Sequence, residues 1–175
     1  MTLEGGCHCG NVRLTLSGVP EGPALVAREC GCSFCVKHGG LWASVPGASL
    51  VVAVAHPSEV HAYTFGTKSA DFHVCRICGV VPLVTSLIDS HLYALVSVRA
   101  LAGIAAASLE RRAADFEGEG MPERLARRAG SWIRDVRFAQ RPGARRAAAR
   151  PAAPPPSGRR PTGDRGRVRG PRRAR

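Results

Sequence analysis

The sequence predicts a mainly β domain that is followed by one late helix and a disordered basic tail. Short alternating or apolar runs, separated by turn residues roughly every eight to twelve positions, indicate an all-β architecture. A helical spacing of apolar residues appears only after residue 120, and from residue 141 the composition changes to Arg, Pro, Ala and Gly. We therefore expect a domain over residues 1–115, a helical extension over 116–140 and a tail over 141–175.

The first expected strand has the clearest pattern, because Val12, Leu14 and Leu16 alternate with polar residues. Such alternation is typical of a strand with one buried face. Turn residues at 66–69 separate two extended runs and predict a hairpin. The remaining expected strands are bounded by glycine, proline or other turn residues and span residues 24–29, 39–45, 50–55, 60–65, 71–75, 80–86 and 91–98.

One helix is expected, over residues 121–138. Pro122 suits its first turn, where the missing N–H costs nothing. The apolar positions that would share one face of this helix are Leu125, Ala129, Trp132, Ile133 and Val136.

The formal net charge of +12 belongs almost entirely to the tail. Residues 141–175 contain twelve Arg and one Asp, a net charge of +11, which leaves about +1 for residues 1–140. The folded part therefore lacks the charge expected of a basic nucleic-acid-binding face. Apolar residues larger than alanine nearly vanish from the tail, so we expect it to be disordered.

The expected location is cytoplasmic. The first ten residues are polar and glycine-rich, without the apolar segment of a secretory signal. The longest apolar runs are far too short to span a bilayer, so no membrane partner is expected. Thiols stay reduced in the cytosol. Seven cysteines, an odd number, therefore indicate metal binding or catalysis rather than disulfides.

Two of the three cysteine clusters predict one closed metal site. Cys75 and Cys78 have the spacing of a zinc knuckle, and the glycine after Cys78 lets the chain leave the turn. Cys7 and Cys9 are flanked by glycines, so the backbone can bend around both thiolates. One pair plus the other makes a four-cysteine site that would cross-link the domain and contribute folding free energy.

The remaining cluster, Cys30, Cys32 and Cys35, supplies only three ligands. Three protein ligands and one open position are typical of a catalytic zinc, and a substrate thiol is a natural fourth partner. Three alternatives stay open at this point. Cys35 could be an ordinary buried cysteine, one cysteine could be a nucleophile with a histidine partner, or a histidine could close a second structural site, the candidates being His8, His38 and His73.

The motifs resemble the glutathione-dependent formaldehyde-activating enzyme family, which includes centromere protein V. The resemblance covers about residues 3–101 and rests on GCHCGNVR at 6–13, on CxCSxC at 30–35 and on CxxCG at 75–79. The stretches at 63–68 and 72–75 look more like the centromere-protein-V branch.

The resemblance implies an Mss4-like β-rich zinc fold with two zinc ions. It implies a structural zinc on Cys7, Cys9, Cys75 and Cys78, and a catalytic zinc on Cys30, Cys32 and Cys35. The implied activity is that of a carbon–sulfur lyase, with a thiol such as glutathione and an aldehyde such as formaldehyde as partners.

The sequence also departs from the family pattern around the middle cluster, at Gly31, at residues 36–40 and at residues 80–83. Trp42 and Phe34 could line the pocket, although core packing is the plainer interpretation. The expected function is a zinc-dependent lyase acting on a thiol–aldehyde adduct. The alternative is a non-catalytic zinc module that binds a partner, with nucleic acid as a weak candidate through the tail.

Overall fold

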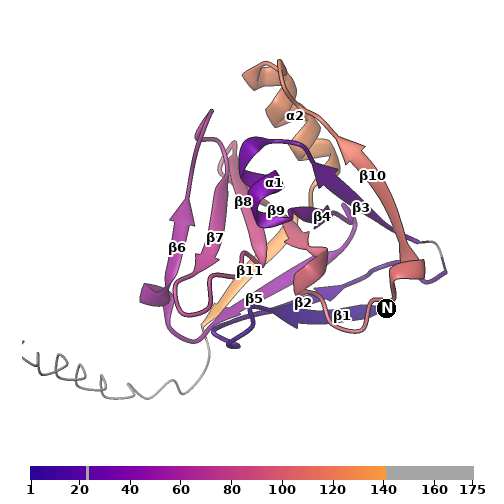
Figure 1. Cartoon of the computed structure of the whole chain (residues 1–175), viewed down its shortest axis with the longest axis vertical. Coiled ribbons are helices and arrows are strands. Elements are labelled where there is room, and N and C mark those ends of the chain that lie inside the picture. Colours follow the sequence, from indigo (N-terminus) through magenta and orange to yellow (C-terminus); the bar gives the residue numbers. More distant parts are fainter. Residues whose placement is uncertain (23, 141–175) are drawn as a thin grey trace, which may run out of the picture. The chain divides into compact units, whose positions relative to one another are not determined.

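The computed structural model of the chain describes residues 1–22 and 24–140 (Figure 1). The expected disordered tail, residues 141–175, lies outside the described residues. The mainly β prediction is confirmed, because the described residues form eleven strands in two sheets, with few helices. In this part of the chain no helix is long and apolar enough to cross a membrane.

The smaller sheet has four strands in the order β1-β2-β5-β11. The strands are β1 (Thr2–Gly6), β2 (Val12–Ser17), β5 (Ser49–Val54) and β11 (Asp135–Gln140). Neighbours are antiparallel except for β11, which pairs parallel with β5. The alternation predicted for β2 is confirmed, since Val12, Leu14 and Leu16 are almost completely buried.

The larger sheet has seven strands in the order β10-β3-β4-β9-β8-β7-β6. In chain order these are β3 (Leu25–Cys30), β4 (Leu41–Ala43), β6 (Val60–Tyr63), β7 (Asp71–Cys75), β8 (Leu83–Ile88), β9 (His91–Ser97) and β10 (Leu109–Ala114). The predicted hairpin is confirmed as the antiparallel pair β6 and β7. The edge strand β10 is parallel to β3.

The helices are short. The α-helices are α1 (Ser33–His38) and α2 (Met121–Ser131), and the single 3-10 turns cover Pro57–Glu59, Val98–Ala100 and Ala106–Ser108. In Figure 1 the four-stranded sheet runs along the bottom of the view, and α1 and α2 lie above it.

The main core lies between the two sheets. Leu14 and Leu50 from the smaller sheet belong to one cluster of buried side chains with Leu83 and Val96 from the larger sheet. Burying a side chain of this size contributes about 1.5–3 kcal/mol relative to leaving it exposed. A second cluster, around Trp42, Tyr93 and Trp132, packs beside the middle cysteines.

The prediction of a helix over residues 121–138 is correct up to residue 131 and wrong beyond it. α2 ends at Ser131, and Ile133 forms an antiparallel bridge with Ala94, with reciprocal N–H···O distances of 2.9 and 3.0 Å. The chain then continues as β11, in which Val136 lies opposite Leu50. The apolar residues at 133 and 136 suit a helix face, but β-branched residues pair well in a sheet, and long-range pairing decides the outcome.

Besides β11, the strands β1 and β10 and the helix α1 were not predicted from the sequence. β10 reads Leu-Glu-Arg-Arg-Ala-Ala and is an edge strand, in which half of the residues are charged and most are exposed. α1 has six residues and begins directly after Cys32, where the cysteine spacing hid any helical period.

Candidate metal centres and cavity

Four cysteines from the two sheets come together. Cys7 follows β1, Cys9 lies in the turn before β2, Cys75 ends β7 and Cys78 lies in the turn after it. The Sγ atoms of Cys7 and Cys9 are 3.6 Å apart, those of Cys9 and Cys75 are 3.5 Å apart, and the four ligand atoms lie within 4.8 Å of one another. Tetrahedral zinc with Zn–S bonds near 2.3 Å would space its sulfurs about 3.8 Å apart, so this cluster fits such an ion.

Glycines shape the backbone around this four-cysteine cluster. A Cβ at Gly6 would overlap the carbonyl oxygen of Val12, so no larger residue fits there. Gly79 has a φ of +75°, in the left-handed region, and its N–H donates to the carbonyl of Cys75 at 2.8 Å. The N–H of Val12 donates to Cys7 Sγ at 3.2 Å and so fixes the position of this sulfur.

The thiols of this cluster do not ionise alike. Burial raises the pKa of Cys78, but the N–H groups of Val80 and Cys9 and the neighbouring sulfurs outweigh it and bring the pKa to about 6. The N–H of Asn11 lowers the pKa of Cys9, yet desolvation and the neighbouring thiols together raise it to about 12. A divalent cation at the centre would favour the thiolate form of both.

The middle cluster is built around the start of α1. Cys30 ends β3, Cys32 immediately precedes the helix and Cys35 lies within it, and the three Sγ atoms lie within 4.8 Å of one another. Cys35 is buried, and Trp42 Nε1 donates to its Sγ at 3.3 Å. A hydrogen bond from Cys35 lowers the pKa of Cys30 to about 5 against the opposing effect of burial, and Cys30 in turn raises the pKa of Cys35.

Within the described residues, no histidine joins the middle cluster. His8 is exposed, and His38 stacks on Phe34 with ring centroids 4.3 Å apart. His73 Nε2 shares a hydrogen bond of 2.8 Å with Thr85 Oγ1. The alternative in which a histidine closes a second site therefore has no support in this part of the chain.

The middle cysteines line a cavity of about 710 Å³, whereas the four-cysteine cluster contributes none of its lining residues. This volume is typical of a small-molecule site. Trp42, Phe65 and Phe72 form an aromatic wall. Phe34 does not line the cavity, and its ring is tilted by 58° against that of Phe72, with centroids 4.7 Å apart.

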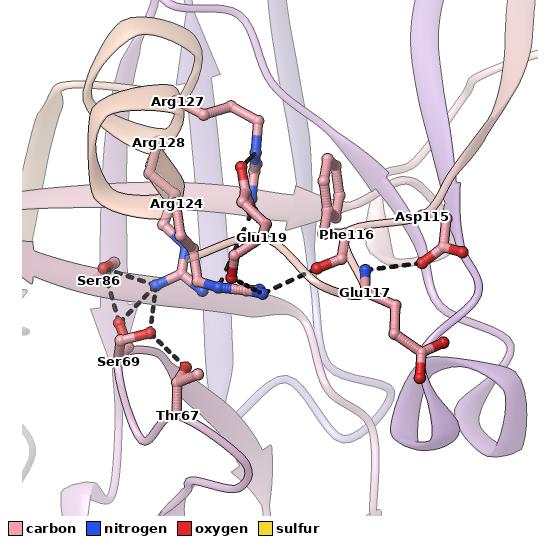
Figure 2. Close-up of polar contacts among 10 residues, drawn as sticks. All are labelled: Thr67, Ser69, Ser86, Asp115, Phe116, Glu117, Glu119, Arg124, Arg127 and Arg128. Carbon is pink, nitrogen blue, oxygen red and sulfur yellow. Dashed lines mark hydrogen bonds and ion pairs between the residues drawn. The ribbon is translucent and has the colours of Figure 1, made fainter. Parts of the chain in front are cut away.

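A second wall of the cavity is basic, and the sequence analysis did not predict it. It comprises Arg28 from β3 and three arginines of α2, namely Arg124, Arg127 and Arg128. Figure 2 shows the three α2 side chains reaching from one face of the helix toward Glu119, Phe116 and Ser69. Their i, i+3, i+4 spacing was the signal that could have placed them on one helix face.

Gly40 has no side chain, and this makes room for Cys35 of the middle cluster and for Trp42. A Cβ there would lie 2.8 Å from both Cys35 Cβ and Trp42 Nε1, and 3.0 Å from Cys35 Sγ. We expect Gly40→Ala to displace the Cys35 thiol, to cost about 1–3 kcal/mol of stability and to weaken metal binding at this cluster alone. Thermal unfolding and a metal count check this against Gly47→Ala, a site with open space. Equal stability and metal content in the two variants would contradict the expectation.

The fold and the two cysteine clusters define a class: a mainly β protein with two groups of thiols that could each hold a metal ion, one of them at a cavity. The chain belongs to the family described as glutathione-dependent formaldehyde-activating enzyme, whose sequence model matches residues 2–116. Membership supports a function in glutathione-dependent formaldehyde activation. A crystal structure of a Rhodobacter sphaeroides protein matches 59% of this chain and 92% of its own, with 29% identity and a TM-score of 0.47.

Proposed function

We propose that the chain is a zinc-dependent carbon–sulfur lyase that joins glutathione, or a related thiol, to formaldehyde and splits the adduct in reverse. Cys7, Cys9, Cys75 and Cys78 hold a structural zinc, and Cys30, Cys32 and Cys35 hold a catalytic one. Residues 1–115 form the catalytic domain, residues 116–140 add a wall to its cavity, and the enzyme acts in the cytoplasm. The family match and the chemistry of the two thiol clusters support this proposal.

One observation carries the proposal: the three-cysteine cluster borders the cavity, and the four-cysteine cluster does not. Four thiolates complete a tetrahedron and leave no place for a substrate, as in structural zinc sites. Three thiolates would leave one position open on an ion, and these three cysteines line space for a small molecule. The cluster with three cysteines is therefore the one that a small molecule in the cavity can reach, and the cluster with four is not.

The reaction adds a thiol across a carbonyl. A carbon–sulfur bond forms, the carbonyl π bond breaks, and the thiol proton ends on the former carbonyl oxygen, so no oxidant or reductant is needed. Zinc, when bound, supplies the positive charge that keeps a thiol in its nucleophilic thiolate form. Trp42 fixes the Cys35 sulfur through its indole N–H, and the aromatic wall gives the cavity an apolar surface. The chain's main contribution is to hold the two reactants together.

A direct assay tests this proposal. The purified full chain should contain two zinc ions and should accelerate exchange between glutathione plus formaldehyde and S-hydroxymethylglutathione, as followed by NMR line shapes or exchange spectroscopy. Chelation should remove the acceleration, and added zinc should restore it. An exchange rate that equals the uncatalysed rate, or one that chelation leaves unchanged, would overturn the proposal.

A further inference from the structure

The basic wall of the cavity carries more positive charge than its surroundings balance. Arg127 is paired with Glu119 through two short contacts, of 2.7 and 2.8 Å. Arg124 Nε lies 3.9 Å from the same carboxylate. Arg128, which exposes only 7% of its surface, has no carboxylate partner within the described residues. The Glu119 carboxylate thus pairs with two of the three α2 arginines, and Arg28 adds a fourth positive charge to the lining.

Arg128 is held by neutral groups only. Its Nη1 donates to the carbonyl of Ser69 at 2.7 Å, to Ser69 Oγ at 2.9 Å and to Ser86 Oγ at 3.2 Å, as Figure 2 shows. Burial, followed by the charges of Arg124 and Arg127, lowers the pKa of Arg128 to about 10. The group therefore remains charged at neutral pH, and a nearby anion would relieve the cost of burying that charge.

Three buried hydrogen-bond donors at this wall lack acceptors within the described residues. They are Arg124 Nε, Arg128 Nε and the indole Nε1 of Trp132, whose residues all line the cavity. Each of these nitrogens can only donate, and a buried donor without a partner costs about 1–3 kcal/mol. A neutral acceptor would satisfy each of these donors, but the excess of arginine charge at the wall favours an acceptor that carries negative charge. A carboxylate has that character, and its two oxygens match the fork of a guanidinium.

The acidic residues of the lining do not fill this role. Asp115 accepts the N–H of Glu117 at 2.9 Å. In Figure 2 both side chains lie on the far side of Phe116 from Arg128. Asp115 instead lies beside the middle cluster, because the carbonyl of the preceding Ala114 accepts the N–H of Gly31 at 3.1 Å. The cavity thus has an acidic and thiol-rich part and a separate basic part.

We propose that the guanidinium groups of Arg124 and Arg128, beside Trp132, bind a carboxylate of the thiol substrate. This inference rests on the proposed function, in which the thiol group of the same substrate lies at the middle cysteine cluster. α2 begins at residue 121, beyond residue 116 where the family match ends, so the carboxylate site lies outside the matched residues. The substrates selected are thiols that carry a carboxylate, in preference to neutral thiols.

Binding of an unreactive probe tests the carboxylate site separately from catalysis. S-methylglutathione has no free thiol, and its dimethyl ester lacks both carboxylates. Titration calorimetry on the zinc-loaded full chain should give about 10- to 100-fold tighter binding of the acid, the range expected for charge-assisted hydrogen bonds. Arg124→Gln and Arg128→Gln should weaken binding of the acid by a similar factor and leave binding of the ester nearly unchanged.

Arg137→Gln, on the exposed face of β11, is the matched control and should bind the acid as the wild type does. Arg124→Gln keeps the test informative if Arg128→Gln fails to fold, which thermal unfolding reports. Equal binding of acid and ester, or no binding of either, would overturn the carboxylate site. Inorganic phosphate that binds as tightly as S-methylglutathione would also overturn it, in favour of a simple anion site. A preference for the acid without any catalysed exchange would reject only the proposed function.

Discussion

Replacing Cys78 with serine is expected to unfold the chain. Cys7 and Cys9 border the smaller sheet, Cys75 ends a strand of the larger one, and a shared ion would clamp the two sheets together. Structural zinc sites in small domains contribute on the order of 10 kcal/mol, while a whole domain is stable by only about 5–15 kcal/mol. Cys78 is half-buried, so the change itself buries little new polar surface.

Circular dichroism and thermal unfolding check this result, with a zinc count on the same samples. We expect Cys78→Ser to lose the cooperative transition of the wild type or to unfold at a far lower temperature, and the chelated wild type to behave in the same way. A folded Cys78→Ser protein with the wild-type melting temperature and two zinc ions would show that this cluster does not hold the sheets together.

Replacing Cys32 with serine is expected to abolish activity and to retain the fold. Cys32 lies at the cavity, directly before α1, and belongs to no strand of either sheet. The protein should lose one zinc of two and keep most of its melting temperature. Loss of an outer-shell partner already costs 10- to 100-fold at metal sites, so loss of a ligand should reduce the catalysed rate at least about 100-fold.

The contrast between the two serine variants separates catalysis from structure. Global unfolding of Cys32→Ser would mean that the middle cluster is a second structural site. Full activity of Cys32→Ser with one zinc would mean that catalysis does not depend on this cluster. Either result would contradict the assignment of the middle cluster as the catalytic site.

The cysteine spacing predicted the grouping of the thiols because metal-ligand motifs are local in sequence. Cys75 and Cys78 are three residues apart, with Gly79 at the turn that the spacing requires. The alternation at residues 12–17 likewise predicted β2, since a strand with one buried face has a period of two. These features depend on neighbours along the chain.

The basic wall could not be predicted in this way, because it depends on long-range pairing. α2 is held by Arg128 on Ser69 and Ser86, residues from a loop and from β8. The helix ends where Ile133 bridges Ala94, which no local pattern indicates. The arginine spacing indicated that these residues share one face of a helix. It did not indicate that this face lines the cavity.

The coordination of the middle cluster is the most direct test of the account. Cadmium-113 NMR of the cadmium-substituted chain should give two resonances, one from each thiol cluster. Added glutathione should shift one resonance and leave the other unchanged, and Cys32→Ser should remove the one that shifts. If neither resonance shifts when glutathione is added, neither ion has a coordination position open to a thiol. That result would contradict the central claim.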